Sequence, residues 1–337
     1  MDSRIATLMA ERDISGLSLA IIQEGKIVKA QGYGFTDKTH KTAVTTKTLF
    51  QAGSISKPVT ALGALHLVEQ NRLSLDSDVN EKLRSWKVPE NDFTQEKKVT
   101  LRGILSHNAG LTIHGFPGYA PKSPLPSLVQ VLDGTHPANT RAVRVAKIPG
   151  LEEQYSGGGY AVMQQLIVDV TEEPFSTFMH ETVLKPFDMT DSIFEQPLPA
   201  HLTLKTAAGH DTNGHAITDR WRIYPEAAAA GLWTTPSDLA KFIISIQEAI
   251  AGKLDFVISP SMARQMVTKQ GHNAGLGLFL EGEGSDLLFM HDGRNEGFDS
   301  ILLARAKTGF GIVIMMNAND NSGVLRDIVI AVHEEYP

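Results

Sequence analysis

The stretch FQAGSISKPVTA, residues 50–61, decides how this chain folds. Apolar residues in it and after it recur with the spacing of three to four that is typical of a buried helix. These positions are Val59, Leu62, Leu65, Leu67 and Val68. Gly53 precedes the pattern as a helix breaker, and Pro58 fits only a first turn, because proline lacks the N–H that an interior turn donates. The stretch therefore predicts a helix that begins near Ser54.

The same turn carries an SxxK motif, Ser54 and Lys57. Side chains three residues apart on a helix stand roughly 5 to 6 Å apart at Cβ, so the hydroxyl and the amine can meet. A serine hydroxyl needs a base to become a nucleophile, and an amine serves when burial and a helix N-terminus lower its pKa. The motif is typical of penicillin-recognising serine enzymes. The spacing also occurs by chance, with the serine as a helix cap and the lysine in solvent.

Composition narrows the classes of function. The chain has 337 residues, enough for one large or two interleaved domains with a buried core. Its 31 Lys and Arg against 38 Asp and Glu give a net charge of −7, with no long run of either sign, so we expect no nucleic-acid partner. It contains no Cys, which excludes disulfides, thiolate chemistry and a cysteine-held metal.

The chain shows no targeting or membrane-spanning pattern. Residues 1–11 include Asp2, Arg4 and Glu11 and lack an apolar core of signal-peptide length, and no apolar run is long enough to span a bilayer. We therefore expect a cytoplasmic protein, with a trimmed secreted chain as the alternative. The oligomeric state is left open.

The chain ends and the chain middle have different patterns, and together they indicate an α+β fold. Strands are expected at residues 16–23, 26–34, 287–290, 298–305 and 311–317. Helices are expected at residues 2–12, 58–70, 101–106, 159–170, 175–182, 236–251 and 324–335. The simplest architecture is an antiparallel sheet built from both chain ends and flanked by terminal helices, with a mainly helical region inserted. The expected domains are residues 1–75 with 206–337, and residues 76–205, with the site in the cleft between them.

Two further segments hold candidate functional residues. PGLEEQYSGGGY, residues 149–160, is a turn and a Gly-rich entry into a helix that would project Tyr155 into a cleft. A packed aromatic residue is the alternative for Tyr155. FMHDGRNEGF, residues 289–298, is a strand end followed by a polar, Gly-flanked turn. His291 there would orient or protonate a group at neutral pH, or lie on the surface of the turn.

Taken in order, SxxK, Tyr-Ser-x and His-x-Gly resemble the class C β-lactamase superfamily. This superfamily includes family VIII carboxylesterases, D-aminopeptidases and low-molecular-weight penicillin-binding proteins. The surrounding sequence is more specific than the motifs, and the resemblance covers residues from about 5 to 335. The segments that carry it are LFQAGSISK at 49–57, LVEQNRLSLD at 67–76, ILSHNAGL at 104–111, residues 149–160, and GLWTTPSDLA at 231–240.

The resemblance implies an acyl-transfer mechanism. Ser54 would attack a carbonyl, and Lys57 with the Tyr155 hydroxyl would carry its proton to the leaving group and help to activate water. Backbone N–H groups of Ser54 and Arg294 would hold the oxyanion. His291 would stand where many relatives carry the lysine of Lys-Thr-Gly. The Lys-Thr-Gly at residues 307–309 instead has the character of a hairpin turn.

Two departures from the superfamily pattern concern the substrate. Gly157 occupies the position of an asparagine that grips the substrate amide in lactam- and peptide-cleaving relatives. Asp292, next to Gly293, stands where a small hydroxyl residue often helps to bind a substrate carboxylate, which an anion would oppose. Both favour esters or lactones over β-lactams. Tyr119 and Trp233 would line an acyl pocket or pack in the core.

We therefore expect a serine hydrolase that acts on small carboxylic esters or lactones, without a cofactor. The alternatives are a D-aminopeptidase, D,D-peptidase or weak β-lactamase, and a penicillin-binding-like sensor or binding module with little turnover. No metal is expected, because the histidines outside the motif show no HExxH or comparable ligand spacing. Those histidines include His66, His107, His114, His210, His215 and His272.

Overall fold

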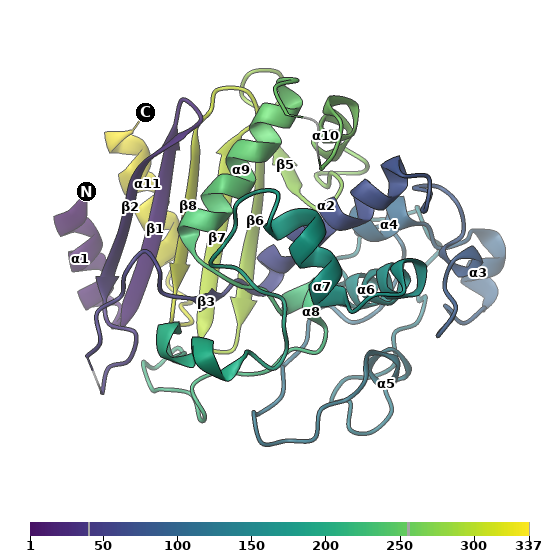
Figure 1. Ribbon diagram of the computed structural model, residues 1–337, viewed down its shortest axis with the longest axis horizontal. Helices are drawn as coiled ribbons and strands as arrows, with labels where there is room; N and C mark the ends of the chain where they lie inside the picture. Colours follow the sequence, from purple (N-terminus) through teal and green to yellow (C-terminus); the bar gives the residue numbers. More distant parts are fainter. Residues whose placement is uncertain (40, 255–256, 337) are drawn as a thin grey trace.

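A six-stranded antiparallel sheet forms the centre of the computed structural model, which describes residues 1–39, 41–254 and 257–336. The strand order is β2-β1-β8-β7-β6-β5 (Figure 1). The strands are β1 Gly16–Gln23, β2 Lys26–Gly34, β5 Phe279–Glu281, β6 Leu288–Asn295, β7 Phe298–Arg305 and β8 Gly311–Met316. Because β1 pairs directly with β8, the two chain ends form one sheet, as the sequence predicted.

Helices cover both faces of this sheet. Helices α1 (Asp2–Glu11) and α11 (Val324–Glu335) share a hydrophobic cluster with one face, and α9 (Pro236–Ile250) belongs to the cluster on the other face (Figure 1). Along β1, Leu19 faces the first cluster and Ala20 the second. A strand that is buried on both faces reads as a continuous apolar run, which is how residues 19–22 appear in the sequence.

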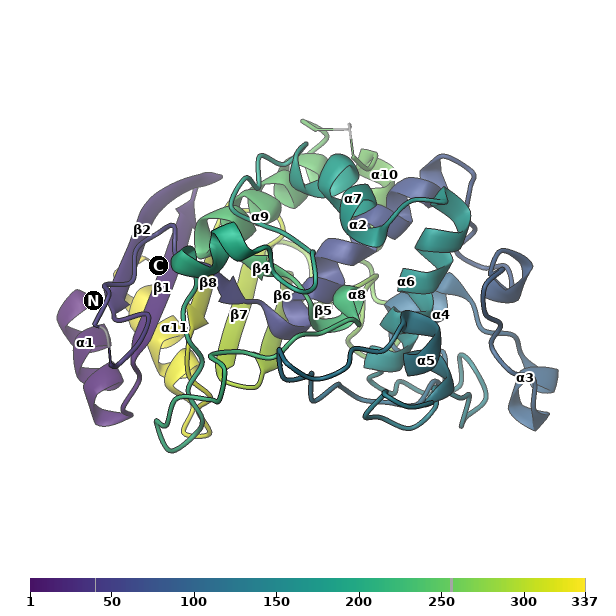
Figure 2. The ribbon, with the colours of Figure 1, turned by 60° about the horizontal axis from the view of Figure 1, so that its bottom comes forward.

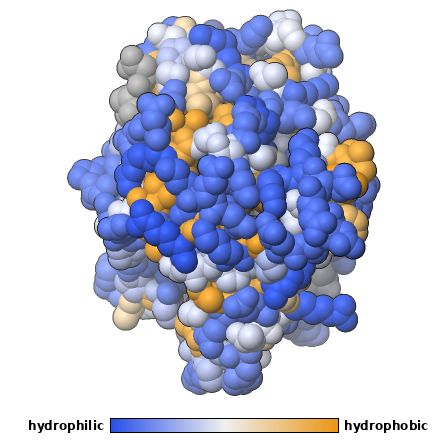
Figure 3. Space-filling view, turned by 90° about the vertical axis from the view of Figure 1, so that its right-hand side faces the viewer, coloured by the Kyte–Doolittle hydropathy of each residue, from blue (hydrophilic) through white to orange (hydrophobic). Residues whose placement is uncertain are grey.

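The remaining helices form the end of the molecule opposite the termini (Figure 2). They are α2 Ser56–Glu69, α3 Asp92–Glu96, α4 Leu101–Leu105, α5 Leu128–Asp133, α6 Gly157–Thr171, α7 Phe175–Met179, α8 Ala227–Ala230 and α10 Pro260–Met266. A small second sheet pairs β3 (Phe50–Gln51) with β4 (Trp233–Thr234). The surface at this end is mostly hydrophilic, with scattered apolar patches (Figure 3). The domain boundary at residues 76–205 stays a prediction.

Strand β6 is longer than the sequence predicted. We expected a strand at 287–290 followed by a polar turn, but the ladder with β7 continues to Asn295, and the turn is only Glu296 and Gly297. The strand alternates buried and exposed residues to its end, with Phe289, His291, Gly293 and Asn295 buried. The polar residues and the glycine conceal this period of two in the sequence. His291 is therefore a buried strand residue and not part of a surface turn.

Short elements account for the other differences. Sequence patterns did not predict β5, α3, α5 or α10, which have only three to seven residues and too few positions to show a period. Within the described residues, no helix is both long and apolar enough to cross a lipid bilayer.

Candidate active site

The SxxK residues lie in a tight turn that leads into α2. Gly53–Ile55 forms a single 3₁₀ turn, and the α-helix begins at Ser56, two residues later than expected. The Ser56 hydroxyl donates to the Gly53 carbonyl at 2.6 Å and accepts the Leu232 N–H at 3.0 Å, which holds the turn against the strand segment before Trp233. Ser54 thus lies at the N-terminus of α2, on a turn that the hydrogen bonds of Ser56 hold in place.

Lys57 reaches back to Ser54, as the spacing predicted. Its Nζ lies 2.9 Å from Ser54 Oγ and 2.8 Å from the carbonyl oxygen of Ala229 in α8. The side chain is only 1% exposed. Burial lowers the pKa of Lys57 to about 7, against the attraction of Asp292, which raises it. A neutral Lys57 can donate one proton to Ala229 and accept the proton of the serine hydroxyl with its lone pair.

Tyr155 joins this pair from the segment before α6. Its ring centroid lies 5.0 Å from Lys57 Nζ, and its hydroxyl interacts with Ser54. Burial raises the pKa of Tyr155, and the hydrogen bond with Ser54 opposes that rise only in part. At neutral pH the side chain is therefore a phenol that can pass on a proton.

The structure brings all three residues to one cavity of about 450 Å³. The described residues that line it are Ser54, Lys57, His114, Gly115, Phe116, Tyr155, Ala229, Ala230, Phe279, Asp292, Arg294 and Asn295. The lining comes from α2, the loops before α6, helix α8 and the β5–β6 edge of the sheet, so segments far apart in sequence build one site.

Two glycines allow β6 to pack closely against the turn that carries Ser54, Gly53–Ile55. A Cβ on Gly53, whose φ is +52°, would lie 2.6 Å from the backbone nitrogen of Arg294. A Cβ on Gly293 would lie 2.0 Å from the carbonyl oxygen of Ala52. Neither position tolerates a side chain without a shift of backbone. Gly293 thus acts through close packing and does not itself line the cavity.

His291 lies beside the cavity and is not a partner of Tyr155 in a hydrogen bond. It is 2% exposed, its Nδ1 lies 2.5 Å from the carbonyl oxygen of Asp292, and its ring centroid is 6.3 Å from that of Tyr155. Among the described residues, its Nε2 has no hydrogen-bond partner. Burial and the charge of Lys57 lower the pKa of His291, so it is neutral at pH 7 and suited to orientation and not to donating a proton.

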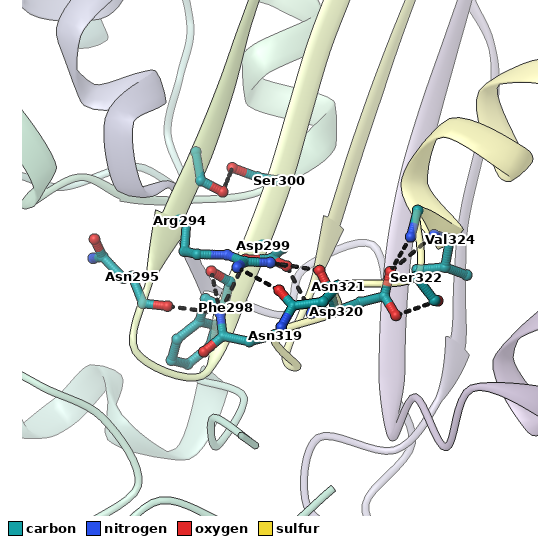
Figure 4. Close-up of polar contacts among 12 residues, drawn as sticks. Arg294, Asn295, Phe298, Asp299, Ser300, Asn319, Asp320, Asn321, Ser322 and Val324 are labelled. Atoms are coloured by element: carbon teal, nitrogen blue, oxygen red, sulfur yellow. Dashed lines mark hydrogen bonds and ion pairs between the residues drawn. The ribbon is translucent and has the colours of Figure 1, made fainter. Parts of the chain in front are cut away.

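The Arg294 side chain is bound by the neighbouring strand β7 and by the loop after β8 (Figure 4). Its Nε and one terminal nitrogen donate to the two oxygens of Asp299 at 2.7 and 2.6 Å. The guanidinium also donates to Asn321 Oδ1 at 2.9 Å and to the carbonyl oxygen of Asp320 at 2.5 Å. The positive charge is therefore paired with a buried carboxylate, while the backbone of Arg294 stays beside Ser54.

Gly157 does not leave open space where relatives carry a side chain. A Cβ there would lie 3.0 Å from the carbonyl oxygen of His114 and 3.2 Å from the Phe116 ring. A side chain at this position would therefore require the loop of residues 114–116 to shift by a few tenths of an ångström. His114 and Phe116, which sequence reasoning did not select, line the cavity in its place.

Tyr119 and Trp233 do not line the cavity. Trp233 is fully buried and packs edge-on against Trp221 and Phe298, with ring centroids 5.3 and 5.8 Å away. Tyr119 is 4% exposed, and its hydroxyl accepts the N–H of Asn139 at 3.1 Å. The structure places both in the core, which was the alternative for each.

Sequence reasoning also missed His107, which clamps the two residues on either side of Tyr155. The carbonyl oxygen of His107 accepts the Gln154 N–H at 2.6 Å, and its Nδ1 accepts the Ser156 N–H at 3.2 Å. Its ring lies 4.3 Å from the Tyr155 ring. Burial, with the neighbouring Lys57, keeps the pKa of His107 low, so its Nδ1 remains an acceptor. No spacing in the sequence indicates this contact across about fifty residues.

Glu226 is a second residue that no motif indicates. It is completely buried, and its backbone carbonyl accepts the N–H groups of Ala229 and Ala230 at 3.0 Å each. Burial raises the pKa of its carboxyl group to about 7. Glu226 thus shapes the short helix α8 that presents the Ala229 carbonyl to Lys57.

We expect Lys307→Ala to leave kcat/KM within about twofold of wild type, as for an ordinary surface substitution. Lys307 to Gly309 lie in the β7–β8 turn, where the Gly309 carbonyl accepts the Gly25 N–H at 3.0 Å. They line a different cavity, of about 860 Å³. Steady-state kinetics on a chromogenic ester would measure the effect. A loss as large as that of Lys57→Ala would mean that the β7–β8 turn, and not β6, contributes to the active site.

The described residues contain no group of three or more His, Asp or Glu side chains arranged to hold a metal ion. At the cavity, Ser54, Lys57 and Tyr155 bring together a hydroxyl, an amine and a phenol.

Comparison with known proteins agrees with this geometry over nearly the whole chain. A family model described as Beta-lactamase matches residues 1–335. Protein flp of Staphylococcus aureus (strain MRSA252) is 24% identical over 336 residues, which are 95% of this chain and 62% of that protein. This chain thus spans about three fifths of the length of the flp proteins.

A relative of similar length is described as a member of the same family, and a solved structure shows the same fold. A Beta-lactamase of Pseudomonas fluorescens is 25% identical, covering 95% of this chain and 93% of that protein. The fold is similar to that of the octameric penicillin-binding protein homologue from Pyrococcus abyssi, with a TM-score of 0.76 and 23% identity over 98% of this chain and 76% of that one. Since the family model spans the sheet, the helical region and every residue of the cavity, the chain belongs to the Beta-lactamase family.

Proposed function

We propose that this protein is a serine hydrolase that forms an acyl-enzyme on Ser54 and hydrolyses carboxylic esters or lactones. The observation that carries the proposal is the 2.9 Å contact between Ser54 Oγ and the amine of Lys57, whose pKa burial lowers to about 7. A base with a pKa near the working pH is the one that takes up a proton most effectively. A binding module would not need this arrangement.

In the first step, Ser54 Oγ attacks the carbonyl carbon while its proton passes to Lys57. The Tyr155 phenol, within reach of Ser54, then passes a proton to the leaving alcohol, and Lys57 replenishes it. In the second step the same groups take a proton from water as it attacks the acyl carbonyl, and they return that proton to Ser54 Oγ when the acyl–Oγ bond breaks and the carboxylic acid leaves. Each step returns Lys57 and Tyr155 to their starting protonation.

Backbone N–H groups of Ser54 and Arg294 are the proposed oxyanion donors. The two-residue turn after Asn295 fixes the alternation of the β6–β7 ladder, which makes Arg294 and Asp299 a non-hydrogen-bonded pair. The N–H of Arg294 then points away from β7. The backbone nitrogen of Arg294 also lies close to Gly53, so this N–H is beside the turn that carries Ser54. Removing one such donor in other enzymes costs about 10²- to 10³-fold in kcat.

Esters are favoured over amides and β-lactams by what lines the cavity. Gly157 offers no side chain to bind an amide, the loop of residues 114–116 packs tightly against its position, and Asp292 adds an anion at the edge of β6. An ester has a better leaving group than an amide and needs less recognition of the carbonyl substituent. Leaving-group protonation by Tyr155 is then less demanding.

A side-by-side substrate panel tests the proposal. Purified protein is assayed with p-nitrophenyl butyrate, a γ-lactone, D-alanine p-nitroanilide and a chromogenic cephalosporin. We expect kcat/KM to be largest for the ester or the lactone. A larger value for the D-alanine anilide would assign a D-aminopeptidase, and a larger value for the cephalosporin a β-lactamase. If no substrate is turned over and no fluorophosphonate adduct forms, the protein would instead be a binding module.

We expect kcat/KM for a neutral ester to fall as the pH decreases below about 7. A protonated Lys57 has no lone pair for the serine proton, so the activity is present above the pKa of Lys57 and lost below it. Rates between about pH 5 and pH 9 would show one limb with an apparent pKa near that value. A flat profile over this range would mean that Lys57 is not the base.

A further inference from the structure

We infer that the cavity selects esters whose alcohol part carries a positively charged ammonium group, and that Asp292 is the residue that selects it. This inference rests on the proposed function and names its substrate class. Asp292 lies in β6 between His291 and Gly293, is exposed, and lines the cavity together with Ser54 and Tyr155. Among the described residues, its carboxylate makes no hydrogen bond or ion pair.

The carboxylate acts on the reacting groups themselves. Its charge raises the pKa of Lys57 and the pKa of Tyr155, which places it within electrostatic range of both. Tyr155 is the group proposed to protonate the leaving alcohol. A positive charge on that alcohol would therefore lie on the side of the cavity that Asp292 faces.

No other charge in the lining cancels that of Asp292. Lys57 is neutral in its active form, and the Arg294 guanidinium is paired with both oxygens of Asp299 and bound to the loop after β8 (Figure 4). The His114 imidazole would compensate that charge only in its protonated form. The remaining lining residues are uncharged. With His114 neutral, the cavity thus holds one uncompensated negative charge at its mouth.

Aromatic rings complete an environment that suits an ammonium group. The ring of Tyr155 lies 6.2 Å from that of Phe279 at an interplanar angle of 23°, and 4.7 Å from the His114 ring. Phe279 of β5 pairs with Met290 of β6, and Met290 is two residues from Asp292. The side chains of Phe279 and Asp292 therefore lie on the same face of the sheet, at its edge. Ring faces attract quaternary and primary ammonium groups, and a nearby carboxylate adds to that attraction. The same charge repels substrates that carry a carboxylate.

Three thioacetates of similar size test the inference: acetylthiocholine, its uncharged isostere S-(3,3-dimethylbutyl) thioacetate, and the anionic S-acetyl-3-mercaptopropionate. Released thiol is measured with a thiol-reactive chromophore, to which the protein contributes nothing because it has no Cys. We expect kcat/KM to be about tenfold higher for the cation than for the neutral ester, and about tenfold lower for the anion. In Asp292→Asn both ratios, cation to neutral and anion to neutral, should move toward one.

Ratios between substrates are the readout because Asp292 also affects Lys57. Removing its charge changes the pKa of Lys57 for all three esters alike, and a ratio within one variant cancels that effect. Glu283→Gln is the matched control, since it removes the same charge from the β5–β6 turn, which does not line the cavity, and it should keep the wild-type ratios. If Asp292→Asn does not fold, the wild-type protein provides the test instead. Added salt should then move the cation-to-neutral and the anion-to-neutral ratios of kcat/KM toward one.

The inference and the proposed function fail in different ways. Turnover of all three esters with ratios near one in wild type would overturn the inference alone. Ratios that persist in Asp292→Asn would likewise overturn it, because another group would then select the charge. No turnover of any ester and no fluorophosphonate adduct on Ser54 would overturn the proposed function and the inference with it.

Discussion

Ser54→Ala lowers kcat for esters by on the order of 10⁴-fold or more, and it abolishes the fluorophosphonate adduct that intact mass spectrometry detects in the wild-type protein; this is the largest effect we expect from a single substitution. Ser54 Oγ is the acceptor of the Lys57 amine, and the hydroxyl sits at the cavity on a rigid 3₁₀ turn. Without it, neither of the two half-reactions has a covalent carrier.

The neighbouring serine supplies a matched control for this prediction. Ser56 is two residues away, but its hydroxyl donates a hydrogen bond to the Gly53 carbonyl and accepts one from the Leu232 N–H. Ser56→Ala should lower the midpoint of thermal unfolding, because it leaves the buried N–H of Leu232 without its partner, yet it should still form the adduct on Ser54. An adduct on Ser54→Ala, or its loss in a folded Ser56→Ala, would mean that the nucleophile has been misassigned.

Local features of the site could be predicted from the sequence because helix geometry dictates them. Ser54 and Lys57 are three residues apart on one turn, so their contact needs no information about the rest of the fold. The sheet built from both chain ends was also predictable, since strands β1, β7 and β8 and the terminal helices bury clear apolar patterns. The exact start of α2 was not, because Gly53 with its positive φ inserts a 3₁₀ turn first.

Contacts between distant segments could not be predicted in the same way. The Ala229 carbonyl that binds Lys57 is a backbone atom, and a backbone atom leaves no signature in the side-chain sequence. His107 acts on Tyr155 through one carbonyl and one ring nitrogen, with no motif spacing between them. Trp233 is apolar and aromatic, which suits a substrate pocket and a core equally, and only the packing of neighbours decides between them.

The strand β6 shows how one wrong boundary changes the chemistry assigned to a residue. With the strand ended at residue 290, His291 would be a solvated histidine that titrates near neutral pH. In the structure the ladder continues past it, and burial with the nearby Lys57 lowers its pKa. Of these two neighbours, Lys57 is therefore the base whose pKa lies near 7, and His291 is a neutral imidazole beside it.

Lys57→Ala should reduce the rate of acylation on the order of 10²- to 10⁴-fold, the usual size of a lost proton transfer. The amine is the one base in contact with Ser54 Oγ among the described residues, and it is also bound to the Ala229 carbonyl. Single-turnover measurements with a chromogenic ester would give the acylation rate directly. Removing a long buried side chain also leaves a cavity, so a loss of activity alone does not distinguish the base from a structural support.

Lys57→Met separates these two roles, because it keeps most of the side-chain volume and removes only the amine. If Lys57 is the base, the methionine variant should be as slow as the alanine variant although it is better packed. The limb of the pH profile near pH 7 should disappear in both, since the group that titrates there is gone. A methionine variant that keeps the wild-type acylation rate, or a limb that survives the substitution, would assign the proton transfer to Tyr155 and leave Lys57 as a support for the turn.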